Sequence, residues 1–177
     1  METVKPIVNR VAQSGLITLD LEDYFPKAEE IDAIDLKEFL FKELILREAE
    51  FREMVKNTDW GKYEGRYVVL YCSSNAIIPM WAYMVLSAQL SVYAKDVACS
   101  SVEHAPEIFL YRNIAKLNID DFKNQRVIVK GCGDRQIPEA AFVQIAEQLS
   151  KVVRSLMYGE ACSSVPVFKK LNDKNEG

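Results

Sequence analysis

Several features that usually reveal a function are scarce or missing in this 177-residue sequence. It has seven glycines and one histidine, and its four cysteines form no C-x-x-C pair. Scarce glycine argues against collagen-like and glycine-linker sequences. A single histidine makes His-rich metal sites and Ser-His-Asp triads hard to build, and the missing C-x-x-C removes the strongest zinc and iron–sulfur signature.

Charge and hydropathy exclude further classes. The formal net charge is −4, so the sequence lacks the basic footprint that nucleic acid or an anionic membrane requires. The longest apolar stretch, residues 76–83, is too short to span a bilayer, and the N-terminus has no apolar core of signal-peptide length. We therefore expect a cytoplasmic protein with no nucleic-acid or membrane partner, in which the cysteines are reduced thiols.

Short β-rich runs alternate with helical runs along the chain. Strands are expected at 16–21, 66–71, 96–98, 126–130 and 155–158, and helices at 35–56, 79–94, 106–117 and 138–155. Strands that alternate with helices in this way are typical of βαβ units. The pattern predicts an α/β fold: a three-layer α/β/α sandwich with a mainly parallel sheet.

The length favours a single domain over residues 1–177. Within it we expect an N-terminal strand and long helix (1–64), a βα-repeat body (65–168) and a frayed polar tail (169–177).

The cysteines recur about 30 residues apart, roughly one βα unit each. Their segments are YCSSNAIIP (71–79), ACSSVEHAP (98–106), GCGDRQIP (131–138) and ACSSVPVF (161–168). In the first three, an expected strand leads into the cysteine and a proline then opens the next helix, a position that proline suits. Every cysteine should therefore lie at or beyond the carboxyl end of a strand, where open α/β sheets bind ligands.

A thiolate site at this edge is one interpretation of the pattern. In a flavodoxin-like strand order, Cys72 and Cys132 would flank the switch point, with Cys162 as a third thiol. The alternative is that the cysteines fill the core, since free cysteine is among the most buried residue types.

Other candidate groups lie near the cysteines. Asp134 could act as a fourth ligand or could cap the following helix, and His104 could pair with Cys99 or lie in a solvated loop. Hydroxyls and backbone N–H groups near helix starts favour anions and could bind a ligand, but serine pairs are also ordinary turn residues, and that is the leading interpretation. The candidate ligand-binding residues are Ser73, Ser74, Gly131, Gly133 and Ser163.

Five segments resemble a family of cytosolic Bacteroidetes proteins described only as a domain of unknown function (2480 series). They are IVNRVAQSGLITLDLEDYFP, LILREAEFREMVKNTDW, YCSSNAIIPMWAYM, and VKGCGD with MYGEACSSVPVFKK. The resemblance covers nearly the whole chain and implies a link to iron–sulfur cluster assembly, with assembly proteins as partners. It places Cys72, Cys132 and Cys162 in motif positions and leaves Cys99 outside them.

The sequence thus favours a thiolate accessory in which Cys72, Cys132, Cys162 and Asp134 hold zinc or an iron–sulfur cluster, or in which the thiols carry sulfur. Two alternatives stay open. One is a non-catalytic interaction domain with core cysteines, and the other is a small-molecule-binding protein that uses the switch-point crevice. Whether the protein is an enzyme is not decided by the sequence.

Overall fold

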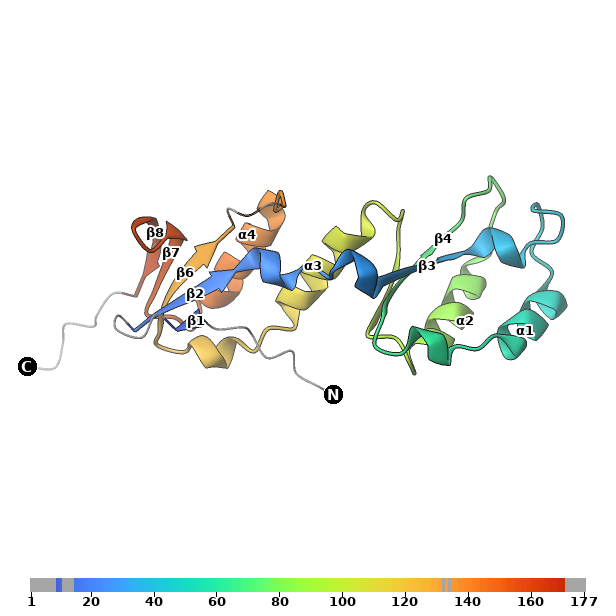
Figure 1. Cartoon of the computed structure of the whole chain (residues 1–177), viewed down its shortest axis with the longest axis horizontal. Helices are drawn as coiled ribbons and strands as arrows, with labels where there is room; N and C mark the ends of the chain where they lie inside the picture. Colours follow the sequence, from blue (N-terminus) through green and yellow to red (C-terminus); the bar gives the residue numbers. More distant parts are fainter. Residues whose placement is uncertain (1–8, 11–14, 132, 134, 171–177) are drawn as a thin grey trace, which may run out of the picture. The chain divides into compact units, whose positions relative to one another are not determined.

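The computed structural model describes residues 9–10, 15–131, 133 and 135–170. The chain divides into two compact units, of which the first combines Met1–Phe25 with Leu110–Gly177 and the second is Pro26–Phe109. Each unit has its own β-sheet and its own hydrophobic core (Figure 1). The expectation of a single domain stays a prediction.

The first unit contains a five-stranded sheet in the order β1-β2-β6-β7-β8. Its strands are β1 (Asn9–Arg10), β2 (Leu16–Asp20), β6 (Arg126–Lys130), β7 (Ser155–Glu160) and β8 (Ser163–Lys169). The three central strands are parallel, whereas β1 and β8 run antiparallel at the two edges. Val127 and Val129 of β6 are buried in one core with Ile145 and Leu149 of helix α4 (Glu139–Leu149).

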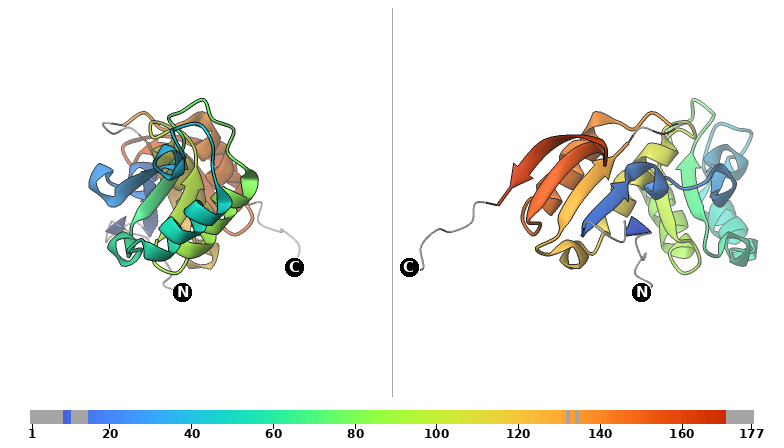
Figure 2. Two further views of the ribbon diagram at one scale, coloured as in Figure 1. Left: turned by 90° about the vertical axis from the view of Figure 1, so that its right-hand side faces the viewer. Right: turned by 60° about the vertical axis from the view of Figure 1, so that its left-hand side comes forward.

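A hairpin of β7 and β8 closes one edge of this sheet (Figure 2). Pro166 lies within β8, and an edge strand is the part of a sheet that tolerates a residue without an N–H group. Because proline also discourages pairing with a further strand, this edge is protected against sheet extension.

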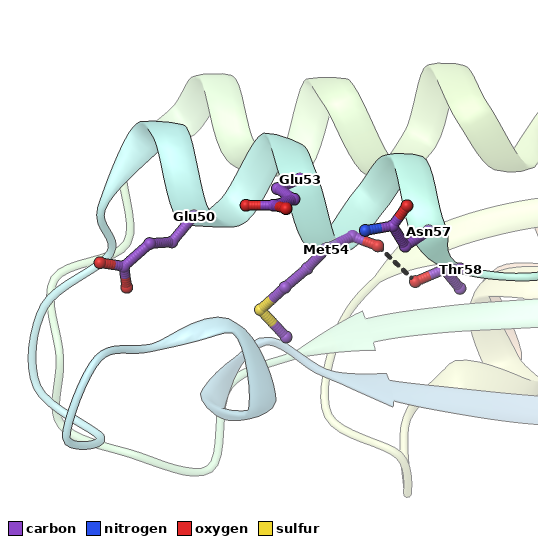
Figure 3. Close-up of a pocket in the computed structure, with 5 residues that line it drawn as sticks. All are labelled: Glu50, Glu53, Met54, Asn57 and Thr58. Atoms are coloured by element: carbon purple, nitrogen blue, oxygen red, sulfur yellow. Dashed lines mark hydrogen bonds between the residues drawn. The ribbon is translucent and has the colours of Figure 1, made fainter.

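The second unit contains a three-stranded parallel sheet in the order β3-β4-β5. Its strands are β3 (Ile31–Asp35), β4 (Tyr67–Tyr71) and β5 (Asp96–Cys99). Helices α1 (Glu48–Asn57) and α2 (Met80–Leu90) lie side by side and share a core with alternate residues of β4 (Figures 1 and 3). The first residues of α3 (Ala105–Ala115) pack against the other residues of β4, so the unit has three layers.

The structure confirms the α/β class and the mainly parallel strands. It also confirms the role of proline, because α2 and α4 begin directly after Pro79 and Pro138. The strands nevertheless form two sheets, and the strands that precede Cys72 and Cys132 lie in different ones. The flavodoxin-like strand order is therefore wrong. Among the described residues, no helix is both long and apolar enough to cross a membrane.

The prediction of a long helix over 35–56 is wrong for the first half of that range. Asp35 ends β3, and its carboxylate accepts the N–H of Lys37 at 2.9 Å, which begins a short 3-10 helix instead. Lys42 and Glu43 then adopt positive φ values of 51° and 59°, which an α-helix cannot contain. The α-helix begins only at Glu48. Strands β3 and β8 were not expected: two aspartates in IDAID and the proline in SSVPVFK lower their β-propensity.

Candidate functional site

Each cysteine that the structure describes lies at the carboxyl end of a parallel strand, as the sequence predicts. Cys72 follows β4, Cys99 is the last residue of β5, and Cys162 follows β7 in the turn of the hairpin. Cys72 and Cys99 belong to the second unit, whereas Cys162 belongs to the first. All three are free thiols. Cys132 and Asp134, the other expected ligands, lie outside the described residues.

The predicted metal site gains no support from the structure. Over the described part of the chain, no group of three or more His, Cys, Asp or Glu side chains is arranged to hold a metal ion. The arrangement that does emerge is a pair of thiols on neighbouring strands of one sheet.

Cys72 and Cys99 are brought together by the register of β4 and β5. Leu70 of β4 pairs directly with Cys99, and the N–H of Ser100 donates to the carbonyl of Leu70 at 3.2 Å. Alternate residues share a face of a strand, so Leu70 and Cys72 point to the same side as Cys99. Extending β4 by one residue at ordinary strand spacing puts the Cα atoms of Cys72 and Cys99 about 8 Å apart. This separation exceeds the usual disulfide range but allows both thiols to contact one small ligand.

The side chain of Cys72 is held by its own loop. Its Sγ lies 3.3 Å from Ser74 Oγ and donates to the Ser74 carbonyl at 3.7 Å. Ser74 Oγ in turn accepts the N–H of Ala76 at 3.2 Å. Half-buried Cys72 also packs against the core under α1 and α2. Ser74, expected to bind a ligand, thus orients a thiol.

A carboxylate fixes the start of the same loop. Asp35, at the end of β3, accepts the N–H of Ser73 at 3.0 Å. Burial of Asp35 opposes ionisation, but hydrogen bonds from Ser73 and from Lys37 outweigh it and lower the pKa of the carboxyl. Ser73, also expected to bind a ligand, therefore joins the carboxyl ends of β3 and β4.

Tyr83 completes the group of side chains around the thiols. It lies on α2 and packs, half-buried, against the same core as Cys72. Burial raises the pKa of Tyr83, and the neighbouring thiols of Cys99 and Cys72 raise it further. The phenol therefore stays protonated well into the alkaline range and can donate a hydrogen bond to a sulfur anion. We refer to Cys72, Cys99 and Tyr83 as the thiol site.

His104 is engaged by a different residue. Its Nδ1 lies 2.8 Å from Ser101 Oγ, one turn before it at the start of α3. Cys99 is exposed in the same β5–α3 connection. The hydrogen bond to Ser101 occupies the ring nitrogen nearest the backbone.

The glycines around position 132 have close neighbours within the chain itself. A Cβ atom at Gly131 would overlap the ring of Phe142, and one at Gly133 would overlap the carboxylate of Glu22. The other oxygen of Glu22 accepts the N–H of Arg135 at 3.2 Å. Intramolecular packing thus accounts for both glycines; their role in ligand binding stays a prediction.

Ser163, the last candidate, is exposed and pairs with Glu160 beside the hairpin turn. Near this turn Lys130 forms ion pairs with Glu160 at 3.3 Å and Asp20 at 3.7 Å across neighbouring strands. These contacts link three strands of the first sheet and leave Ser163 outside the thiol site.

A shallow depression of about 440 Å³ lies on the outer face of α1 (Figure 3). Its lining residues are Glu50, Glu53, Met54, Asn57 and Thr58. Thr58 donates its hydroxyl to the Met54 carbonyl at 2.8 Å, and Glu50 is paired with Arg47 at 2.9 Å. The depression is open to solvent and holds no thiol, so it does not compete with the thiol site.

Sequence reasoning did not find Tyr83 and undervalued Cys99. Two signals were available in the sequence. The succession of β4, α2 and β5 forms a βαβ unit, which places the ends of β4 and β5 next to each other, and Tyr83 lies one turn after Pro79, near the start of α2. The family described as "Protein of unknown function (DUF2480)" matches residues 5–170 of the chain. No curated protein and no solved structure matches the chain.

Proposed function

We propose that this chain, which belongs to the DUF2480 family of proteins of unknown function, is a thiol-exchange protein that carries sulfur on Cys99. The observation that supports the proposal is the placement of Cys72 and Cys99 at the carboxyl edge of β4 and β5, with Tyr83 of α2 packed against the same core as Cys72. This edge is also where parallel α/β sheets commonly bind their ligands.

The three side chains suit different roles. Cys99 is exposed, so an incoming sulfur compound can reach it. Cys72 is half-buried and hydrogen-bonded to Ser74, which suits a second thiol that orients or receives the sulfur. Tyr83 is a hydrogen-bond donor whose raised pKa keeps its proton in place.

The reaction is an exchange between sulfurs. The Cys99 thiolate attacks the terminal sulfur of a donor persulfide, R–S–SH. The S–S bond of the donor breaks and R–S⁻ leaves with the electron pair, while a new S–S bond forms at Cys99. The transferred sulfur keeps its proton in this step and then loses it to R–S⁻ or to solvent, and the Tyr83 hydroxyl donates to the resulting persulfide anion. An acceptor thiol removes the terminal sulfur by the same step, and no external oxidant is needed.

The metal-bound form of the thiolate hypothesis is not part of this proposal, since the described residues contain no group that could hold a metal ion. The proposal also differs from the sequence-based set in its residues. It uses Cys99, which the resemblance left aside, and it does not depend on Cys132 or Cys162.

The test is incubation with a low-molecular-weight persulfide, followed by intact-mass measurement and peptide mapping. We expect the gain of one sulfur atom at Cys99, loss of that product in Cys99→Ser, and a less stable product in Cys72→Ser. Cys162 is the matched control, because it is also an exposed thiol after a parallel strand but lies in the other unit. Equal labelling of Cys162 and Cys99, or no labelling of Cys99, would falsify the proposal.

A further inference from the structure

Helix α2 has an exposed apolar surface that does not contribute to the hydrophobic core. None of its residues is charged, and Met80, Met84 and Ala88 recur every fourth position on its outer face. Met80 is 72% exposed, Met84 70%, and Ile77, in the loop before the helix, 93%. We call Ile77, Met80, Met84, Ala88 and the 73%-exposed Val92 the α2 stripe. An exposed helix face is normally polar, so this surface suggests a binding partner.

The α2 stripe is continuous with the thiol site. Met80 and Tyr83 are three residues apart on one helix, so their side chains are neighbours on its surface. Ile77 belongs to the loop that connects Cys72 to α2. A body that rests on the first half of α2 therefore lies next to the two thiols.

The size of the α2 stripe indicates what kind of partner it accepts. A fully exposed side chain of this size offers about 100 Å² of apolar surface, so the four larger side chains, which are 70–93% exposed, together offer about 300 Å². A stable interface buries about 800 Å² on each partner, whereas brief redox encounters bury less. The α2 stripe alone is thus too small for a lasting dimer of this chain and suits a transient contact.

We infer that the α2 stripe is a docking surface for an uncharged, apolar polypeptide segment that presents a persulfide sulfur to Cys99. The inference rests on the proposed function and adds the class of donor. An anionic small thiol gains no binding affinity from an uncharged apolar helix. An apolar segment does gain affinity, because its binding removes methionine and isoleucine side chains from water.

The experiment uses three activated disulfides in a C132S/C162S background. Each probe joins nitrothiobenzoate through a disulfide to a methyl group, to a short apolar peptide, or to a polar uncharged peptide of equal length. Cys99 attacks the sulfur of the methyl or peptide group. A disulfide to Cys99 forms, the probe disulfide breaks, and nitrothiobenzoate leaves with the electron pair and is measured by absorbance.

We expect the apolar peptide to react about tenfold faster than the polar one. Met80→Gln combined with Met84→Gln should remove this difference and leave the methyl probe unchanged. Met54→Gln, a partly exposed methionine on α1, is the matched control and should leave all three rates unchanged.

The outcomes separate the two proposals. A methyl probe that fails to react at Cys99 overturns the proposed function. A reactive methyl probe without preference for the apolar peptide overturns the docking inference alone. Sedimentation gives a further check: a stable dimer that Met84→Glu dissociates would assign the α2 stripe to a second copy and overturn the inference as well.

Discussion

The carboxylate of Asp35 accepts the N–H of Ser73 at 3.0 Å, and this bond ties the end of β3 to the residue directly after Cys72, just beyond the end of the neighbouring strand β4. The same oxygen accepts the N–H of Lys37. One aspartate therefore terminates its own strand and anchors the loop that carries a thiol of the proposed site.

Asp35→Ala should destabilise the second unit by about 1–3 kcal/mol, because two backbone donors lose a charged acceptor. The effect depends on pH. The folded-state pKa of Asp35 is lowered, so the unfolded chain binds more protons at this group. Its stabilisation is present above about pH 4 and is lost as pH falls through the folded-state pKa. Urea unfolding at a series of pH values measures both quantities.

The control for this prediction is Glu64→Gln, a change at an exposed carboxylate for which no hydrogen bond is found among the described residues. It should leave the acid limb of the pH profile in place, whereas Asp35→Ala should flatten that limb. An identical acid dependence in wild type and Asp35→Ala would show that the carboxylate contributes no linked stability.

Gly131→Ala should destabilise the first unit by about 1–3 kcal/mol, since a Cβ atom there meets the ring of Phe142 on α4. Gly133→Ala should cost less, because its Cβ meets the flexible end of Glu22. Phe142→Leu should recover part of the Gly131→Ala loss when the two are combined. Denaturant unfolding of the double-mutant cycle measures this coupling; strict additivity would contradict the contact.

Asn113 forms another contact that only tertiary structure reveals. It is 7% exposed, and its side-chain N–H donates to the carbonyl of Tyr24 at 2.9 Å across 89 residues of sequence. Asn113→Leu should cost about 1–3 kcal/mol, because it leaves the Tyr24 carbonyl without this donor. Thermal unfolding measures the loss, and Asn118→Ala, at an exposed asparagine, is the control.

The sequence predicted the parts of this molecule that depend on local chemistry. Hydrophobic periodicity located α2 and β6, and prolines located the helix starts at Met80 and Glu139. Sequence spacing also placed each described cysteine at a strand end. These features follow from residues close in the chain, which a single sequence displays directly.

The partition of strands between two sheets was not predictable in this way. Whether β6 pairs with β4 or with β2 depends on contacts between residues distant in the sequence, about 100 positions apart in the pairing with β2. The residues of β4 and β6 have the same buried apolar character, so their sequences do not indicate that they belong to different sheets. That choice decided the site. It separated Cys72 from the sheet that carries Cys162 and made Cys99 its nearest strand neighbour.

Tyr83→Phe tests whether the phenol acts on the thiols or only fills space. The ring and its packing remain, so the stability of the fold should change little. The persulfide on Cys99 should decay about tenfold faster, because a hydrogen bond to an anionic sulfur is lost. Mass spectrometry after removal of the persulfide donor gives the decay rate, and Tyr93→Phe, at a more exposed tyrosine past the end of α2, is the control.

A spectroscopic titration separates this role from a purely structural one. Burial and the thiols of Cys99 and Cys72 raise the pKa of Tyr83 above its ordinary value, so its phenolate should form at a higher pH than that of a free tyrosine. Replacing both cysteines by serine removes two negative charges at alkaline pH. The pKa of Tyr83 should then fall toward its ordinary value without reaching it, because burial remains. The difference in phenolate absorbance between each protein and its Tyr83→Phe variant isolates the titration of Tyr83. If the pKa of Tyr83 does not change in the double serine variant, the thiols lie too far from Tyr83 for the proposed exchange.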